Sequence, residues 1–415
     1  MEFGGEAAAS YRYDQDQHRQ NANHNVMFAA RVRDGVVLAT VFLFSAGLAL
    51  PGLVILTAVV LAGAVTGTWR WTPTRLDRPL AFLAAAAVLS TLLSPWRAVG
   101  IEPLLLLVAT MLVSVGGAAA YSPRGGRGLA LVAVWVAGAI PAAVVGLARA
   151  RPDAGLPAAL PTLGPNGLGT TMAVAAVLAA ALAATARSAL RWAAAAAAGL
   201  LAVATAATYA RGAWAALAAG LLMVVVTAPD RRRKFAVAAG AAAVLALVGA
   251  VAVHWPAAAR KARSAVSLGA NRDRLVLWET ALRIFAAHPV LGTGFGTFQA
   301  AYERYRPADA PQPEAPFAHN LLLNSLAEMG VVGAAALVTL CGAGLAAAWR
   351  WMSRSPPGAA ERATATALLA AIVTLLVHQL FDGTVLSVHV GFGFFALLAL
   401  AAAREGRPPD GRPSQ

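Results

Sequence analysis

The sequence predicts an all-α polytopic membrane protein of about twelve transmembrane helices with one large loop outside the membrane. Apolar residues make up 59% of the 415-residue chain, charged residues make up only 13%, and the mean hydropathy is +0.65. A soluble domain of this composition would have too little polar surface. The apolar residues also form repeated runs that are long enough to cross ~30 Å of hydrocarbon as helices. These runs lack the alternating pattern of membrane β-barrel strands.

The apolar runs divide the chain into tails, spans and one loop. Residues 1–34 are polar, lack the apolar core of a cleavable signal peptide, and are expected to form a cytoplasmic tail. The first nine helices are expected within 35–253, the loop within 254–318, the last three helices within 319–403, and a second cytoplasmic tail within 404–415. The individual spans are predicted near 35–50, 52–68, 79–94, 101–121, 128–148, 167–186, 190–208, 211–228, 235–253, 319–348, 363–381 and 384–403.

The arginines and lysines give the orientation of these spans. Positive residues in short loops stay on the cytoplasmic side of a membrane. One set of connections is rich in them, as in "RRRK" at 231–234, whereas the short loops of the other set contain only Arg97, Arg149, Arg151 and Arg211. Both termini are therefore expected in the cytoplasm and the long loop on the outer face. Long loops are exempt from the charge rule and are commonly functional, so the site is sought there.

The formal net charge of +14 does not by itself indicate a nucleic-acid partner. The positive residues separate the apolar runs and do not form a basic face. The bilayer is the partner that this pattern indicates, and no nucleic acid is expected.

The long loop contains a predicted helix in "NRDRLVLWETALRIFAAHPVLG". Leu275, Trp278, Leu282 and Phe285 recur at helical spacing, and the pattern stops at Pro289. The following "LGTGFGTF" is rich in glycine but follows a helix and lacks the Lys-Ser/Thr pair of a phosphate loop. It indicates a tight turn.

The arginines of this predicted helix lie on two faces. Arg272, Glu279 and Arg283 share the face opposite the apolar residues, where a solvated salt-bridged surface is expected. Arg274 falls beside Trp278, on the edge of the apolar stripe. A guanidinium at that place suits a phosphate-like anion, or it extends to the membrane surface while its stem is buried.

Polar residues open the tenth span in "PFAHNLLLNSLAEMG". His319 falls at its outer end, and Asn320, Asn324 and Glu328 follow on one helix face. A carboxyl group two turns into a span needs a polar partner, so Glu328 is expected to be buried and to hold a neighbouring helix. His319 is either a general base or an ordinary interfacial residue.

Three further outer positions carry polar groups. Arg211 in "TYARGAW" is an ordinary loop arginine or an anion ligand, and Asn166 in "LGPNGLG" caps a helix or contributes to an anion site. His378 lies four residues before Asp382, a spacing that favours a structural hydrogen bond between them. No HExxH, DxD or acid-pair motif is present, so no dedicated metal site is expected. The single cysteine, Cys341, allows neither a disulfide nor a Cys-based metal site within one chain.

The ordered set of these motifs resembles the O-antigen ligase and O-antigen polymerase superfamily from about residue 160 to 400. "LGPNGLG" is similar to the family's Asn-Pro-Asn segment, with Gly164 in place of the first asparagine. "YARGAW" is similar to its Ser-Arg-Gly-Ala turn, and "LVHQLFDG" to its His-x-x-x-Asp segment. The family pattern of a loop helix, a proline, a Gly-x-Gly turn, "HN" and Glu-x-Gly is matched by Arg274, Trp278, Pro289, Gly292, Gly294, His319, Asn320, Glu328 and Gly330.

The resemblance implies an enzyme of the bacterial inner membrane with a periplasmic site. Its expected activity is glycosyl transfer, without metal or cofactor, from an undecaprenyl-diphosphate-linked glycan to a hydroxyl group. The acceptor is lipid A-core in ligases and the next repeat unit in polymerases, and a single long loop favours a ligase. His319 becomes the leading catalytic candidate, Arg211 and Arg274 the expected diphosphate ligands, and Arg272 a secondary one. The supporting residues are Asn166, Trp278, Asn320, Glu328, His378 and Asp382.

Other functions stay open at this point. A polymerase of O-antigen or exopolysaccharide, or a protein O-glycosylation ligase, would use the same donor class. A transporter or lipid flippase would show polar residues near mid-membrane, broken helices and repeated halves. Here the polar residues gather at one face and no internal repeat is found, so transport ranks below transfer.

Overall fold

The structure is a computed structural model that describes residues 31–65, 73–121, 127–152, 154–186, 188–228, 230–256, 259–260, 268–383, 385 and 388–405. Most of both expected tails, residues 1–30 and 406–415, lies outside these described residues. Within the described part the chain forms helices and no strand, apart from two isolated bridges that pair Arg151 with Leu156 and Leu160 with Leu163.

The predicted fold class, an all-α polytopic membrane protein, is confirmed. Each predicted apolar range coincides with a helix, and seven helices of the described part are long and apolar enough to cross a membrane. The helices of these ranges are residues 31–45, α2 (Ala49–Val65), α3 (Asp77–Leu92), α4 (Arg97–Ala120), α5 (Arg127–Arg149), α6 (Pro165–Thr185), α7 (Ser188–Ala207), α8 (Arg211–Thr227), α9 (Arg231–His254), α13 (Leu321–Arg354), α14 (Ala360–Gln379) and α15 (Val388–Glu405).

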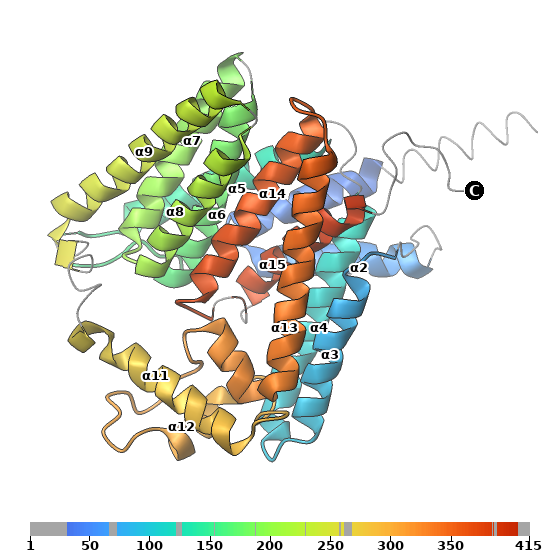
Figure 1. The fold of residues 1–415 in the computed structure, drawn as a ribbon, viewed down its shortest axis with the longest axis vertical. Coiled ribbons are helices and arrows are strands. Elements are labelled where there is room, and N and C mark those ends of the chain that lie inside the picture. Colours follow the sequence, from blue (N-terminus) through green and yellow to red (C-terminus); the bar gives the residue numbers. More distant parts are fainter. Residues whose placement is uncertain are drawn as a thin grey trace, which may run out of the picture.

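Helix α6 lies at the centre of one half of the bundle, among α5, α7, α8 and α14 (Figure 1). In its apolar stretch 78% of the residues are buried, against 6% for α9, which covers α7 and α8 from outside. Small residues allow the central backbones to approach closely. A Cβ atom added to Gly220 of α8 would lie 2.0 Å from Oγ1 of Thr374 on α14. The abundant alanine and glycine therefore serve the packing of this half.

The loop between α9 and α13 contains two helices, α11 (Leu268–Ala287) and α12 (Phe298–Tyr305), which lie together at one end of the molecule (Figure 1). The predicted helix of the loop is confirmed, and the face that packs is not the one marked by Leu275 and Leu282. Leu277, Ala281 and Ile284 pack into a small second core with α12 and the start of α13, whereas Leu275 and Leu282 are 42% and 50% exposed. Apolar residues lie on two sides of α11, and the helical spacing alone does not say which side packs.

The glycine-rich turn of the loop packs against a break in α13. Gly330 has a φ of +62°, so the backbone departs from helical geometry there, and the N–H of Val331 donates to the carbonyl of Pro289 at 2.9 Å. A Cβ atom on Gly330 would lie 2.3 Å from the backbone of Val290. One on Gly292, whose φ is +66°, would lie 2.3 Å from the backbone of α13. Both glycines are needed because two backbones touch at this point.

We expect Gly330→Ala to lower the stability of the folded protein by at least about 2 kcal/mol, because the methyl group meets backbone and the φ value is unfavourable for an L side chain. The matched control is Gly342→Ala in the same helix, where an added Cβ atom meets nothing within 4 Å. Thermal unfolding in detergent, followed by tryptophan fluorescence, measures both. An equal midpoint for the two variants would contradict the proposed close contact.

Candidate functional site

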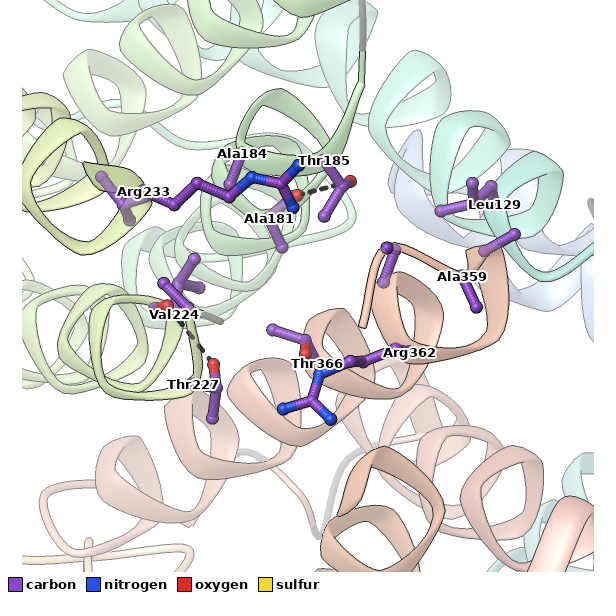
Figure 2. A pocket seen from close by; sticks show the side chains of 15 residues that line it. Leu129, Ala181, Ala184, Thr185, Val224, Thr227, Arg233, Ala359, Arg362 and Thr366 are labelled. Carbon is purple, nitrogen blue, oxygen red and sulfur yellow. Dashed lines mark hydrogen bonds between the residues drawn. The ribbon is translucent and has the colours of Figure 1, made fainter. Parts of the chain in front are cut away.

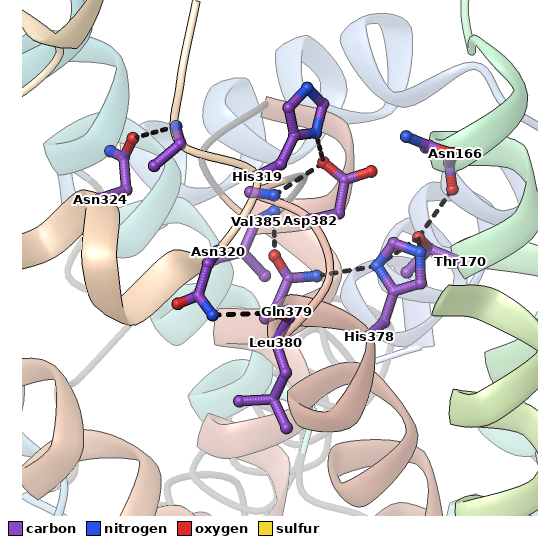
Figure 3. Close-up of polar contacts among 12 residues, drawn as sticks. Asn166, Thr170, His319, Asn320, Asn324, His378, Gln379, Leu380, Asp382 and Val385 are labelled. Atoms are coloured by element: carbon purple, nitrogen blue, oxygen red, sulfur yellow. Dashed lines mark hydrogen bonds and ion pairs between the residues drawn. The ribbon is translucent and has the colours of Figure 1, made fainter. Parts of the chain in front are cut away.

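The predicted polar residues meet at the end of the bundle where α11 and α12 lie. The site is built by the starts of α6, α8 and α13, by α11 and by the turn that follows α14. Figure 3 shows the part of it that surrounds the start of α13. Residues from the two halves of the chain thus come together at one face of the membrane protein.

His319 is held at the entrance of α13 by its neighbours. Its φ is +52°, a left-handed conformation that histidine adopts more readily than most residues. Asn320 is the N-cap of α13, where its Oδ1 accepts from the N–H of Leu323 at 3.1 Å and its Nδ2 donates to the carbonyl of Leu380 at 3.0 Å. The imidazole packs edge-on against Phe317, with ring centroids 4.6 Å apart. Asn320 therefore links the entrance of α13 to the end of α14.

The imidazole of His319 pairs with Asp382. Its Nδ1 lies 2.9 Å from Oδ1 of the carboxylate, and the Asp382 side chain is 2% exposed while that of His319 is 27% exposed (Figure 3). Burial raises the pKa of Asp382, but the hydrogen bond and charge of His319, the nearby His378 and the N–H of Gly383 outweigh burial and leave this pKa below its usual value. The ionised carboxylate accepts the Nδ1 proton, which leaves the lone pair on Nε2.

The expected hydrogen bond between His378 and Asp382 is wrong. The ring nitrogens of His378 lie 3.1 Å from Oγ1 of Thr170, and Asp382 pairs with His319. The Thr170 hydroxyl donates to the carbonyl of Asn166 at 2.8 Å, so it accepts from the imidazole. The physical reason is that α14 ends at Gln379. Asp382 belongs to the turn after the helix and does not lie one helical turn above His378.

Two arginines lie within charge range of this pair. The pKa of the half-buried Arg274 lies below its usual value, chiefly because burial lowers it. The Asp382 carboxylate raises this pKa and Arg211 lowers it, so both charges act on Arg274. Arg211 is the first residue of α8, and its Nη2 donates to Oδ1 of Asn271 at 2.7 Å. This bond joins α8 to α11 one turn before Arg274. The site therefore contains two guanidinium groups against one carboxylate, an excess of positive charge that favours an anion.

Arg272 lies on another face of α11. Its Nη2 pairs with Oδ2 of Asp309 at 2.7 Å, and the two side chains are 57% and 74% exposed. The predicted salt-bridged surface is confirmed nearby, because Arg283 pairs with Glu279 at 2.7 Å and both are exposed. Exposed pairs of this kind contribute little stability. Of the two arginines considered from the sequence, Arg274 is the one beside Asp382.

Glu328 is buried as expected, and its partners are backbone groups of the loop and the side chain of Asn324. Its two carboxylate oxygens accept from the N–H of Gly296 at 3.0 Å and from the N–H of Phe298 at 2.9 Å. Phe298 is the first residue of α12, where a negative charge is favourable. On the same face, Oδ1 of Asn324 accepts from the N–H of Ala318 at 2.9 Å. These bonds fix the loop on both sides of α12 and hold the backbone just before His319.

The two remaining predicted residues have less distinct environments. Asn166 is the second residue of α6 after Pro165, and no side chain caps this helix, so the expected capping role is not seen. Figure 3 places its side chain beside Thr170 and His378. Trp278 lies one turn after Arg274, and its buried Nε1 makes no hydrogen bond within the described residues.

Sequence reasoning missed three residues of the site. Asn271 holds Arg211, Thr170 holds His378, and Gln379 accepts from the N–H of Val385 at 3.0 Å through its Oε1. Asn271 and Thr170 lie three and four residues from recognised candidates on the same helix, so helical spacing is a signal that could have found them. Across the described residues, histidine, cysteine and acidic side chains form no group of three that could hold a metal ion.

A family model described as O-antigen ligase matches residues 196–338 of the chain. No curated protein matches the chain. The matched region includes Arg211, Arg274, His319 and Glu328, whereas Asp382 lies beyond its end.

We expect Glu328→Gln to loosen the segment around α12, because an amide nitrogen cannot accept and one buried N–H loses its partner at a cost of about 1–3 kcal/mol. Hydrogen–deuterium exchange of the backbone amides in residues 293–300 should become faster. Glu279→Gln, at an exposed pair on α11, is the control and should leave this exchange unchanged. Equal protection in both variants would contradict the role of Glu328.

Proposed function

We propose that this chain is an O-antigen ligase of the O-antigen ligase and polymerase superfamily, and the match of an O-antigen ligase family model to residues 196–338 supports the proposal. It transfers O-antigen polysaccharide from undecaprenyl diphosphate to a hydroxyl of lipid A-core, at the periplasmic face of the bacterial inner membrane. The observation that carries this proposal is the His319–Asp382 pair beside Arg274 and Arg211. A base and a surplus of positive charge at one place suit the attack of a hydroxyl on a phosphate-linked sugar.

The arginines bind the donor. The guanidinium of Arg274 is half-buried, where its interaction with an anion is stronger than in water. Its planar fork matches phosphate oxygens, and Arg211 adds a second positive charge from α8. Negative charge grows on the diphosphate as the bond to the sugar breaks, and the two side chains stabilise that charge.

His319 acts on the acceptor. Its Nε2 makes no hydrogen bond within the described part of the chain, and the side chain is partly exposed, so a hydroxyl group can reach it. Nε2 takes the proton of the acceptor hydroxyl while that oxygen forms a bond to the anomeric carbon. The buried Asp382 carboxylate holds the imidazole in the required tautomer and stabilises the imidazolium that results.

The leaving group explains the rest of the site chemistry. The bond between the anomeric carbon and the diphosphate oxygen breaks with its electron pair on oxygen, which gives undecaprenyl diphosphate as a stable anion. A glycosidase needs a carboxylic acid to protonate a poor leaving group, but a diphosphate needs none. A single displacement of this kind inverts the anomeric carbon.

The acceptor separates a ligase from a polymerase. Both use the same donor and the same base, so the site geometry suits either enzyme. The single long loop between α9 and α13 favours the ligase, since two sizeable periplasmic loops are typical of polymerases. Transport is less well supported, because the polar groups of the candidate site lie together at one end of the bundle and not at its middle.

The decisive assay mixes the purified protein in detergent with undecaprenyl-diphosphate O-antigen, lipid A-core and EDTA. The test variant is His319→Asn, because asparagine tolerates the left-handed conformation but is no base. We expect a glycan ladder on lipid A-core with the unchanged protein and about 100-fold less or none with the variant. His254→Asn, at an exposed histidine at the end of α9, is the control.

Each other outcome of this assay has a meaning. Elongation of the donor with no ladder on lipid A-core would assign a polymerase. A His319→Asn variant that is folded and fully active would exclude His319 as the base. No reaction with either acceptor would remove the support for glycosyl transfer.

Donor binding is tested with Arg274→Lys, which keeps the charge but loses the fork. Losing one charge-assisted hydrogen bond of about 1.5 kcal/mol should raise the KM for the donor by roughly tenfold. Arg272→Lys, at the exposed pair with Asp309, serves as the comparison and should leave that KM unchanged. The reverse result would assign the diphosphate to Arg272.

A further inference from the structure

A groove lies beneath α9 at the end of the bundle opposite to His319. It is a cavity of about 400 Å³ bounded by the second half of α6, the first half of α7, and α8 and α9. The start of α6 borders the candidate site, whereas its second half borders the groove. The two features are therefore separated by most of the length of a helix that spans the bundle.

The walls of the groove are apolar and made of small residues. Ala183, Ala195, Gly199 and Gly240 are examples, and a Cβ atom added to Gly240 would meet nothing within 4 Å. The apolar stretch of α9 is only 6% buried by the protein. An apolar groove of this volume under an exposed apolar helix suits a hydrocarbon chain.

One end of the groove is basic. Arg191 of α7 and Arg233 of α9 line it, together with Trp192, which is 73% exposed and lies 6.0 Å from the guanidinium of Arg191. Among the described residues, no acidic side chain lines the groove. Arg233 pairs with Asp230, the N-cap of α9, but at 3.5 Å and with both side chains about half exposed. An exposed tryptophan beside arginines is typical of the level of lipid head groups.

A second cavity of about 400 Å³ adjoins this basic end, and the two share Ala184, Arg233 and Val237. Figure 2 shows Arg233 and Arg362 on opposite sides of this second cavity. Arg362 donates to the carbonyls of Met352 and Ser355 at 3.3 and 3.2 Å, so its position is set by the end of α13. Within the part of the chain that the structure describes, this cavity has no acidic lining residue either.

We propose that the groove binds an anionic phospholipid from the adjacent leaflet, with one acyl chain beneath α9 and the phosphate between Arg191 and Arg233. The apolar walls match the chain, and the arginines match the charge of the head group. A free anion would gain nothing from the apolar groove, and a zwitterionic lipid such as phosphatidylcholine carries, beside its phosphate, a choline cation that the two arginines repel. The site is independent of the proposed glycosyl transfer, because it lies at the other end of the bundle.

The charge of the lipid is tested by native mass spectrometry of the full-length protein in detergent. Phosphatidylglycerol and phosphatidylcholine with identical acyl chains are compared as probes. We expect tighter retention of phosphatidylglycerol, with each arginine contributing about fivefold. Arg191→Gln/Arg233→Gln should abolish the preference. Arg231→Gln/Arg232→Gln removes the same number of positive charges from the same end of the bundle. These two arginines do not line the groove, so the preference should remain.

The groove itself is tested by filling it. Gly240→Leu adds a side chain whose Cβ atom meets nothing within 4 Å, and it should reduce phosphatidylglycerol retention by about as much as the double arginine variant. Gly249→Leu is the matched control in the same helix, since its added Cβ atom also meets nothing within 4 Å but does not line the groove. Equal retention of both lipids by the unchanged protein, or equal effects of each variant and its control, would overturn the proposal. Circular dichroism and gel filtration confirm that each variant is folded.

Discussion

The buried carboxylate of Glu328 is the interaction on which the outer part of the structure depends. It lies within α13, yet both of its oxygens accept from backbone N–H groups of the loop, at Gly296 and at the start of α12. A charged group inside a membrane protein is costly unless its hydrogen bonds are satisfied, and here backbone donors satisfy them. The break at Gly330 makes room for the loop that supplies these donors. One acidic residue and one glycine thus attach the loop to the bundle.

That attachment determines where the polar groups of the site lie. Helix α11 packs against α13 and α12, which brings Arg274 towards the end of α14 and lets Asn271 bind Arg211 of α8. His319 and Asp382 come from two further elements, the entrance of α13 and the turn after α14. Four segments that are distant in sequence therefore supply one cluster. The second core beneath α11 supports this cluster from below.

The two ends of the bundle differ in the surroundings of their charged residues. At the end with His319, charged groups are paired or half-buried and face one another. At the other end, arginines line cavities that contain no acidic wall residue. Arginine thus has two proposed roles in this protein. Beside His319 and Asp382, its planar guanidinium group suits a diphosphate. Above an apolar groove, arginines suit a lipid head group.

Local patterns in the sequence were enough to predict the helices, the long loop and the polar residues that lie at the candidate site. Hydropathy and helical period depend on local spacing, so the apolar ranges, the loop helix and the burial of Glu328 were predictable from it. The partner of Asp382, the packed face of α11 and the bond between Arg211 and Asn271 were decided only by the tertiary structure. A hydrogen bond between distant segments depends on where each helix ends and how it packs. The end of α14 at Gln379, which turns Asp382 towards His319 and away from His378, is not encoded in the four-residue spacing between them.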